Sequence, residues 1–145
     1  MPPRLRAISE RHLREPARIT IAGEKSAAGK LPRVRQVAYV VSRPHKAAAL
    51  QRVLDMESPK SAIVFCRTKR GTERIYRRVS KGFPATDMMH GDMAQSARDR
   101  VMKAFRAGNV KLLIATDVVG RGIDVTGISH IINYDMPQSS DDYVH

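Results

Sequence analysis

Short runs of apolar and β-branched residues alternate along the chain with stretches of helical periodicity. The apolar runs predict five strands, at residues 34–41, 62–66, 87–90, 112–116 and 130–134. Between them, apolar side chains recur every three or four positions, which predicts helices at residues 45–56, 72–80 and 95–107. This alternation of strands and helices is typical of an α/β domain.

The apolar runs also indicate how the strands pair. Residues 112–115 (Leu-Leu-Ile-Ala) are apolar at successive positions rather than at alternate ones, which favours a parallel sheet covered by helices on both faces. Ligands of such sheets gather at the carboxyl ends of the strands. We therefore expect the polar clusters after Phe65, Met89 and Ala115 to share one functional edge.

The first part of the chain has a different character from the rest. Residues 4–14 could form a short basic helix that Pro16 ends, and residues 23–32 resemble a linker of small residues. We expect no independent core there. The chain has 145 residues, of which 42% are hydrophobic, and this length suits one compact domain, predicted at residues 34–145.

Composition limits the possible binding partners and the location of the protein, but it does not identify the partner. A formal charge of +12 would attract a polyanion, either nucleic acid or an acidic membrane surface. No run of about 18 apolar residues occurs, and the first residues lack the apolar stretch of a secretory signal. We expect no membrane span and a cytoplasmic location. Cys66, the single cysteine, lies in an apolar run and is predicted to be a buried hydrophobe.

The chain lacks the motifs of a complete nucleotide-hydrolysis site. Gly23 and Gly29-Lys30 resemble a phosphate loop, but five residues separate the glycines and Leu31 replaces the required Ser or Thr. No Asp-Glu-x-Asp run is present to hold magnesium. Any ATPase activity would therefore need a partner domain.

Residues 115–125 concentrate the candidate chemistry. Here a buried strand ends in two glycines, Gly120 and Gly122, which permit unusual backbone angles and close approach of another backbone. The hydroxyl of Thr116 suits a phosphate or sugar, and Asp124 could accept a hydrogen bond from a ribose hydroxyl. The alternative is an ordinary connection between a strand and a turn, with solvated charges.

A family resemblance rests on motifs in this order. Residues 63–68 (Ile-Val-Phe-Cys-Arg-Thr) resemble motif IV of DEAD-box helicases, residues 90–98 with 105–108 resemble motif IVa, and residues 115–125 resemble motif V. Residues 131–137 and 142–145 resemble the approach to motif VI and end on its first histidine. Residues 1–21 are similar to the segment that comes after the Ser-Ala-Thr motif of the first RecA-like domain.

This resemblance implies a fold and an activity. The implied fold is an α/β, parallel-sheet RecA-like domain of the P-loop NTPase type, incomplete at its C-terminus. Residues 1–33 would be the end of a first RecA-like domain and the interdomain linker. The implied function is the C-terminal half of an ATP-dependent RNA helicase, with ATP and Mg²⁺ held mainly by the absent N-terminal domain. Since the catalytic arginines of motif VI follow the last residue, the chain alone is not expected to hydrolyse ATP.

The resemblance also assigns roles residue by residue. Arg98 and Thr116 would contact RNA phosphates or sugars, helped by the backbone around Thr68 and Gly91. Lys69 and Arg70 open a basic run beside motif IV and are further candidates for phosphate contacts, although such a run is often only a solvated helix face.

Other residues are implied to act at the domain interface. Asp124 would contact the ATP ribose, and Arg121 and His145 would couple this domain to the first one. His90 is predicted to be a hydrogen-bonded residue at the end of a strand, with no metal site. Two alternatives stay open, a stand-alone basic RNA-binding module without ATP turnover and a DNA-directed relative.

Overall fold

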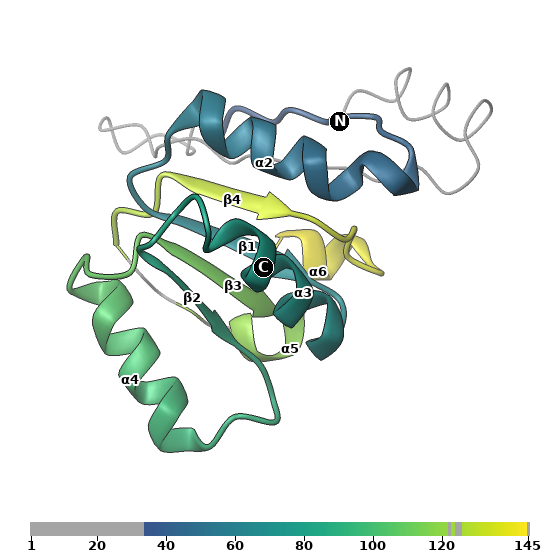
Figure 1. Ribbon diagram of the computed structural model, residues 1–145. Coiled ribbons are helices and arrows are strands. Elements are labelled where there is room, and N and C mark those ends of the chain that lie inside the picture. The colour runs from purple at the N-terminus through teal and green to yellow at the C-terminus, as the bar shows by residue number, and fades with distance from the viewer. Residues whose placement is uncertain (1–33, 122, 124–125, 145) are drawn as a thin grey trace.

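The molecule is built on one parallel sheet, seen in a computed structural model that describes residues 34–121, 123 and 126–144. The strands are β1 (Ala62–Cys66), β2 (Thr86–Met89), β3 (Leu112–Thr116) and β4 (His130–Asn133). Their order across the sheet is β2-β3-β1-β4, and every neighbouring pair is parallel (Figure 1). The proposed boundary after residue 33 lies at the edge of the described residues and stays a prediction.

Helices cover both faces of this sheet. A 3₁₀ turn, η1 (Arg43–His45), leads into α2 (Lys46–Glu57), and α3 (Lys69–Val79) and α4 (Gln95–Arg106) follow β1 and β2. Two short helices, α5 (Asp117–Gly120) and α6 (Ser140–Val144), follow β3 and β4. None of the described helices is long and apolar enough to cross a membrane.

Alternate residues of each strand enter two separate apolar clusters. Val64 and Ile114 pack with α2 and α3 on one face, whereas Ile63 and Leu113 pack with α4 on the other. The two clusters sandwich β3, whose five residues are all buried. The predicted α/β fold with a parallel sheet and helices on both faces is therefore confirmed.

One predicted strand is wrong. Residues 34–41 form no strand in the structure, and only Ala38 and Val41 make isolated bridge contacts. Val34 and Val40 are 40% and 47% exposed. The run is rich in β-branched residues, but it does not pair along its length with a sheet strand, and propensity alone does not make a strand.

Boundaries and short helices account for the other differences. The predicted helix at residues 72–80 begins earlier, at Lys69. Strands predicted at residues 87–90 and 130–134 run from Thr86 to Met89 and from His130 to Asn133. Helices α5 and α6 were not predicted, because four or five residues are too few to show helical periodicity.

Asp135 joins three parts of the chain just beyond β4. Its carboxylate accepts hydrogen bonds from Lys46 Nζ at 2.5 Å and from the backbone N–H of Arg67 at 2.7 Å. The Lys46 ammonium also lies 4.3 Å from the centre of the Tyr134 ring. Asp135 thereby connects the start of α2, the end of β1 and the end of β4.

Cys66 lies inside this region as a buried side chain, as the sequence predicts, and is 1% exposed. Burial, and secondarily the negative charge of Asp135, raises the pKa of its thiol to about 12. Burial likewise raises the pKa of Tyr134 to about 12. Both groups stay neutral at ordinary pH and act as packing elements.

Replacing Asp135 should test how much this junction stabilises the fold. Asp135→Ala leaves the partly buried Lys46 ammonium and the Arg67 N–H without their acceptor, which should cost about 1–3 kcal/mol of unfolding free energy. Urea denaturation followed by circular dichroism measures this loss. Asp55→Ala, at an exposed position of α2, is the matched control and should change stability by less than about 0.5 kcal/mol. Equal midpoints for the two variants would contradict the assignment.

Candidate nucleic-acid interface

Three loops leave the sheet side by side at the carboxyl ends of its strands. Cys66 of β1 pairs in register with Thr116 of β3, and Met89 of β2 pairs with Ala115. The segments that start at Arg67, His90 and Asp117 therefore begin at one level of the sheet (Figure 1). We call this rim the carboxyl edge, and it brings together the predicted residues Thr68, Gly91 and Thr116.

Thr116 stands at the centre of the carboxyl edge. It is the last residue of β3 and the N-cap of α5, and it is only 5% exposed. Its hydroxyl makes no capping hydrogen bond, and no side-chain bond of Thr116 occurs elsewhere in the described part of the chain. The Thr116 hydroxyl thus lies nearly buried at the carboxyl edge, without a side-chain hydrogen bond to another described residue.

Thr68 organises the N-terminus of α3. Its hydroxyl accepts a hydrogen bond from the N–H of Gly71 at 3.0 Å, and its carbonyl accepts from the N–H and hydroxyl of Thr72 at 2.9 and 3.0 Å. The side chain of Thr68 is therefore occupied, and the N–H groups of Lys69 and Arg70 remain at the open end of the helix. Such an end attracts anions, because its free N–H groups and the helix dipole both favour negative charge.

The side chain of His90 fixes the loop after β2 to α3. The buried His90 ring holds Glu73 Oε1 at 3.2 Å through Nε2 and accepts from the N–H of Asp92 at 3.3 Å through Nδ1. This is the hydrogen-bonded strand-end histidine that the sequence predicts. Gly91 is exposed, and a Cβ at its position would meet nothing within 4 Å. Its lack of a side chain therefore serves no internal packing and leaves the backbone open to approach.

Lys69 has a partner within the edge itself. Its ammonium lies 2.5 Å from Asp92 Oδ2, and both side chains are more than half exposed. The hydrogen bond from Lys69 lowers the pKa of the Asp92 carboxyl. Arg70, the next residue, is exposed on α3. Of the two predicted phosphate contacts, Lys69 is therefore shared with a carboxylate.

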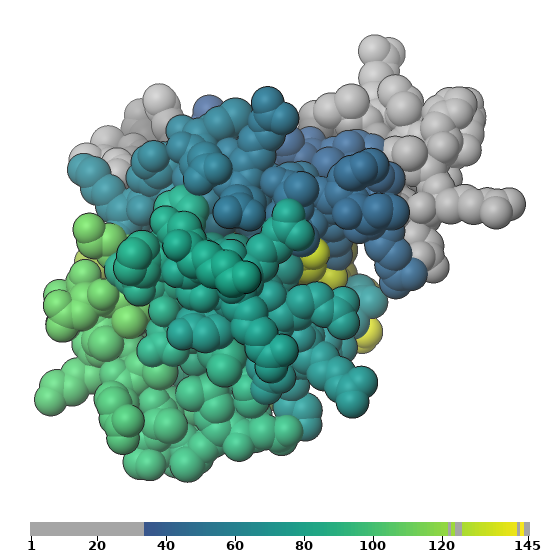
Figure 2. Space-filling model, in the orientation of Figure 1, coloured from purple at the N-terminus to yellow at the C-terminus, as the bar shows by residue number. Residues whose placement is uncertain are grey.

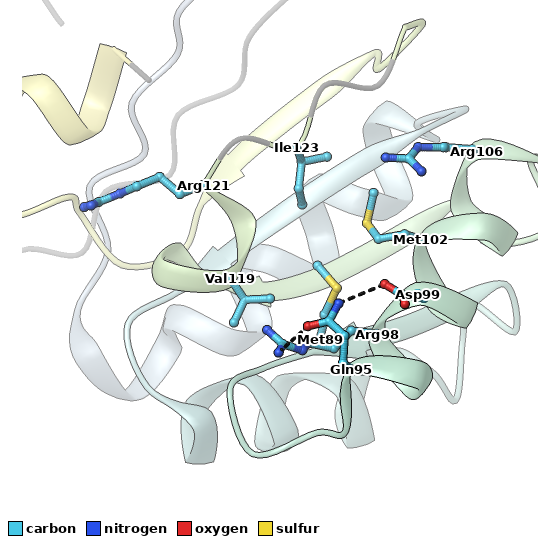
Figure 3. A pocket seen from close by; sticks show the side chains of 9 residues that line it. All are labelled: Met89, Gln95, Arg98, Asp99, Met102, Arg106, Val119, Arg121 and Ile123. Atoms are coloured by element: carbon cyan, nitrogen blue, oxygen red, sulfur yellow. Dashed lines mark hydrogen bonds between the residues drawn. The ribbon is translucent and has the colours of Figure 1, made fainter.

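Arg98 lies in an open depression of about 200 Å³ between α4 and the segment that follows β3. Gln95 holds it, since Arg98 Nη2 donates to Gln95 Oε1 at 2.7 Å and Gln95 Nε2 donates to Asp99 Oδ1 at 2.8 Å (Figure 3). Among the described residues, Arg98 Nε is the buried side-chain nitrogen or oxygen that lacks a hydrogen-bond partner. A buried N–H without an acceptor is costly in a folded protein.

The depression has a mixed lining, whose apolar part is formed by Met89, Met102, Val119 and Ile123 and whose other side chains are polar or charged. Arg121 borders the depression but its side chain points away from the other labelled residues in Figure 3. Arg121 is exposed, and its backbone N–H closes α5 on the carbonyl of Asp117 at 3.0 Å. Both arginines therefore line one depression, but the Arg121 side chain points away from Arg98.

The role of Gly120 differs from the predicted one. It does not have a positive φ, so backbone freedom is not the reason for a glycine there. Instead, a Cβ at this position would lie 2.2 Å from Phe65 Cε1. Gly120 is needed because α5 packs directly on the Phe65 ring.

Three predicted residues cannot be placed. Asp124 and His145, the predicted ribose and coupling residues, and Gly122 lie outside the described residues. Their roles stay predictions. In the described part, no three histidine, cysteine or acidic side chains come together in a way that could hold a metal ion.

Sequence reasoning missed two residues that support the site. Gln95 fixes Arg98, and its spacing of three residues on a helix is a detectable signal for such a pair. Phe65 determines the residue at position 120 through a contact between distant segments. No local pattern could have revealed that contact.

Comparisons with known proteins agree with this fold. Residues 45–145 match the helicase conserved C-terminal domain. The whole chain is 38% identical to the RNA helicase CrhR of Synechocystis sp., of which it covers 29%. A DEAD box protein from Methanococcus jannaschii has a TM-score of 0.66 at 36% identity, over 72% of this chain and 29% of that one. Dbp5 of S. cerevisiae bound to RNA and ADP BeF3 has a TM-score of 0.62 at 31% identity, over 69% and 27%.

The parallel sheet and its polar carboxyl edge define a RecA-like domain of the helicase class. The chain belongs to the helicase C-terminal domain family, and relatives that match its whole length include DEAD-box RNA helicases. It spans less than a third of the length of CrhR.

The contact between Gly120 and Phe65 gives a direct stability test. Gly120→Ala forces the Phe65 ring or α5 to move, which should cost about 1–3 kcal/mol of unfolding free energy. Adding Phe65→Leu, which removes the ring, should recover part of that loss, so a double-mutant cycle in urea should show coupling above about 0.5 kcal/mol. Gly91→Ala, where a Cβ meets nothing, is the control. Additive effects of the two substitutions would contradict the packing explanation.

Proposed function

We propose that this domain is the C-terminal half of an ATP-dependent RNA helicase, which binds the RNA backbone at its carboxyl edge and completes an ATP site with an N-terminal RecA-like domain. The observation that carries the proposal is the buried Arg98 Nε–H without an acceptor. It belongs to an edge on which Thr116 and the start of α3 also present unsatisfied donors.

The chemistry of the edge suits a phosphate backbone. Its free groups are donors: the Arg98 guanidinium, the Thr116 hydroxyl and the N–H groups of Lys69 and Arg70. Phosphate oxygens accept from all of these, and arginine binds them most strongly. Contacts of this kind position a nucleic acid without selecting its sequence. The backbone at Gly91 adds an open surface against which a strand can lie.

The distribution of aromatic residues points the same way. Every tyrosine and phenylalanine of the described part is buried or half-buried, so it offers no exposed platform for stacking bases. Binding through stacked bases therefore has little support. Binding through the backbone remains, and it suits an enzyme that acts on many sequences.

Relatives support RNA over DNA as the substrate. CrhR is named an RNA helicase, and the similar structure of Dbp5 contains RNA and ADP BeF3. We infer that this chain has the same type of ligand, with the DNA-directed alternative set aside on this support.

The ATP part of the proposal involves residues at the rim. Asp124 would accept from the ATP ribose, and Arg121 and His145 would contact the N-terminal domain, which would hold Mg²⁺ and most of the nucleotide. ATP binding would supply the energy that closes the two domains on each other, and ATP hydrolysis would let them open again. Because the competent site exists only when both domains meet, RNA and ATP binding are reciprocally coupled.

A second candidate function is a stand-alone basic RNA-binding module. The formal charge of +12 supports it, because charge and the edge loops alone would suffice to bind RNA. The two proposals differ in nucleotide dependence. Only the helicase proposal predicts that ATP and RNA affect one another's binding.

Arg98→Ala should weaken RNA binding, since it removes a charge-assisted donor that is fixed by Gln95. We expect about a tenfold loss of affinity for single-stranded RNA, which corresponds to about 1.4 kcal/mol. Fluorescence anisotropy with labelled oligouridylate measures it. Arg100→Ala, two residues away and exposed, removes the same charge and should have a much smaller effect. Equal affinities for the Arg98 and Arg100 variants would exclude Arg98 from the site.

Comparing the chain with a longer protein tests the ATP part. The 145-residue chain should bind RNA in a salt-sensitive manner without hydrolysing ATP, because the phosphate loop is missing. A protein that carries the chain behind an N-terminal RecA-like domain and includes motif VI should hydrolyse ATP faster with RNA. Phosphate release at two salt concentrations measures both. An RNA-independent rate in the longer protein would favour the module.

A further inference from the structure

The outer face of α3 carries a line of basic side chains that leads away from the carboxyl edge. Arg70, Arg74 and Arg77 are exposed on the helix, and Lys81 is exposed just after it. Their spacings of four, three and four residues put them on one side of a helix. We call these four residues the α3 stripe. Figure 2 shows the α3 region, in teal, at the centre of the open face in view.

No acidic side chain neutralises the stripe in the described part of the chain. Glu73, the acid of α3, turns toward the buried His90 at 3.2 Å. The neighbouring Lys69 is paired with Asp92, and Arg78 Nε donates to Gln51 Oε1 at 3.4 Å. Within the described part of the chain, the side chains of the four stripe residues make no hydrogen bond or ion pair.

This arrangement is unfavourable for the helix itself. Like charges at positions three or four apart destabilise a helix by a few tenths of a kcal/mol per pair. The first turn of α3 has no acidic residue, and Arg70 adds positive charge at the end of the helix where the dipole is already positive. The inward face compensates through Ile75 and Val79, which are buried in the core. A bound polyanion would relieve all of these repulsions at once.

We propose that the α3 stripe binds the phosphate backbone of an RNA duplex that flanks the single strand held at the carboxyl edge. This inference rests on the proposed RNA-binding function and adds a second binding site, on the outer face of α3, for the helical segment next to the single strand. Continuity supports it, because the stripe begins at Arg70, at the same N-terminus of α3 that opens onto the edge.

The chemistry of the stripe fits a duplex better than a second single strand. It contains no aromatic residue, and Tyr76, the aromatic of α3, packs against the core. Unpaired bases would therefore find no surface to stack on. A duplex hides its bases and presents phosphates, at about one charge per 1.7 Å of axis for DNA. From Arg70 to Arg77 the helix rises roughly 10 Å, so several phosphates come within reach.

The test compares two double variants of the 145-residue chain. Arg74→Gln with Arg77→Gln removes two charges from the stripe, and Arg100→Gln with Lys103→Gln removes two exposed charges from α4. The probes are one labelled single-stranded RNA and the same strand extended by a hairpin. Anisotropy titrations at several potassium chloride concentrations give the affinity and the salt slope for each.

On the hairpin-extended RNA, the stripe variant should bind about tenfold more weakly. The slope of log affinity against log salt concentration should become roughly 1.8 less steep, as expected for the loss of two phosphate contacts. On the single strand it should match the control variant. Equal affinities and salt slopes of the two variants on the extended RNA overturn the proposal. This is the result expected if the stripe binds an acidic protein instead. An equal loss on both probes also overturns it, because the stripe would then belong to the single-strand site.

Two further measurements separate this inference from the proposed function. Arg98→Ala should weaken binding of the single strand, and its failure to do so counts against the RNA site and not against the stripe. Urea midpoints of the stripe variant should equal or exceed that of the unmodified chain, because like-charge repulsion is removed. A lower midpoint would show that the stripe stabilises the fold, which overturns its assignment to a ligand.

Discussion

The complete burial of β3 is the constraint on which the rest of the structure depends. This strand lies between β2 and β1 within the sheet and between two layers of helices above and below it. A strand enclosed in this way can carry only apolar side chains along its length, and Leu112 to Ala115 meet that requirement. Polar function is therefore excluded from the strand and begins at its last residue, Thr116. The two neighbouring strands end at the same level, which makes one edge of the sheet the place for chemistry.

At that edge the domain holds charge and donors that its own acids do not satisfy. The Arg98 Nε–H is buried without an acceptor, α3 begins with basic residues at the positive end of its dipole, and the α3 stripe has no counter-charge among the described residues. Each of these features costs some stability in the isolated domain. They have one chemistry in common, which is that a phosphate backbone would satisfy all of them. Three of the acids nearby, Asp135, Glu73 and Asp92, instead fix loops and helices to one another.

Much of this could be predicted from the sequence because the signals were local. Apolar runs gave β1 and β3 at their observed bounds and the other strands of the sheet within a residue. The false strand at residues 34–41 has the right residue types, but whether a run becomes a strand depends on a partner that sequence does not show. The edge itself was predictable, since parallel strands bring their carboxyl ends together. The position of Arg98 over its depression and its fixation by Gln95 depend on tertiary packing, and so does the reason for Gly120.

The contact of Gly120 with Phe65 has a mechanical consequence. The ring occupies the space that any side chain at position 120 would need, so α5 packs directly on β1. A displacement of α5, which begins just after Thr116, would therefore push on the Phe65 ring, three residues before Thr68 at the start of α3. The Phe65 ring thus links the segments that follow β1 and β3, so a ligand that moved one of them would also act on the other.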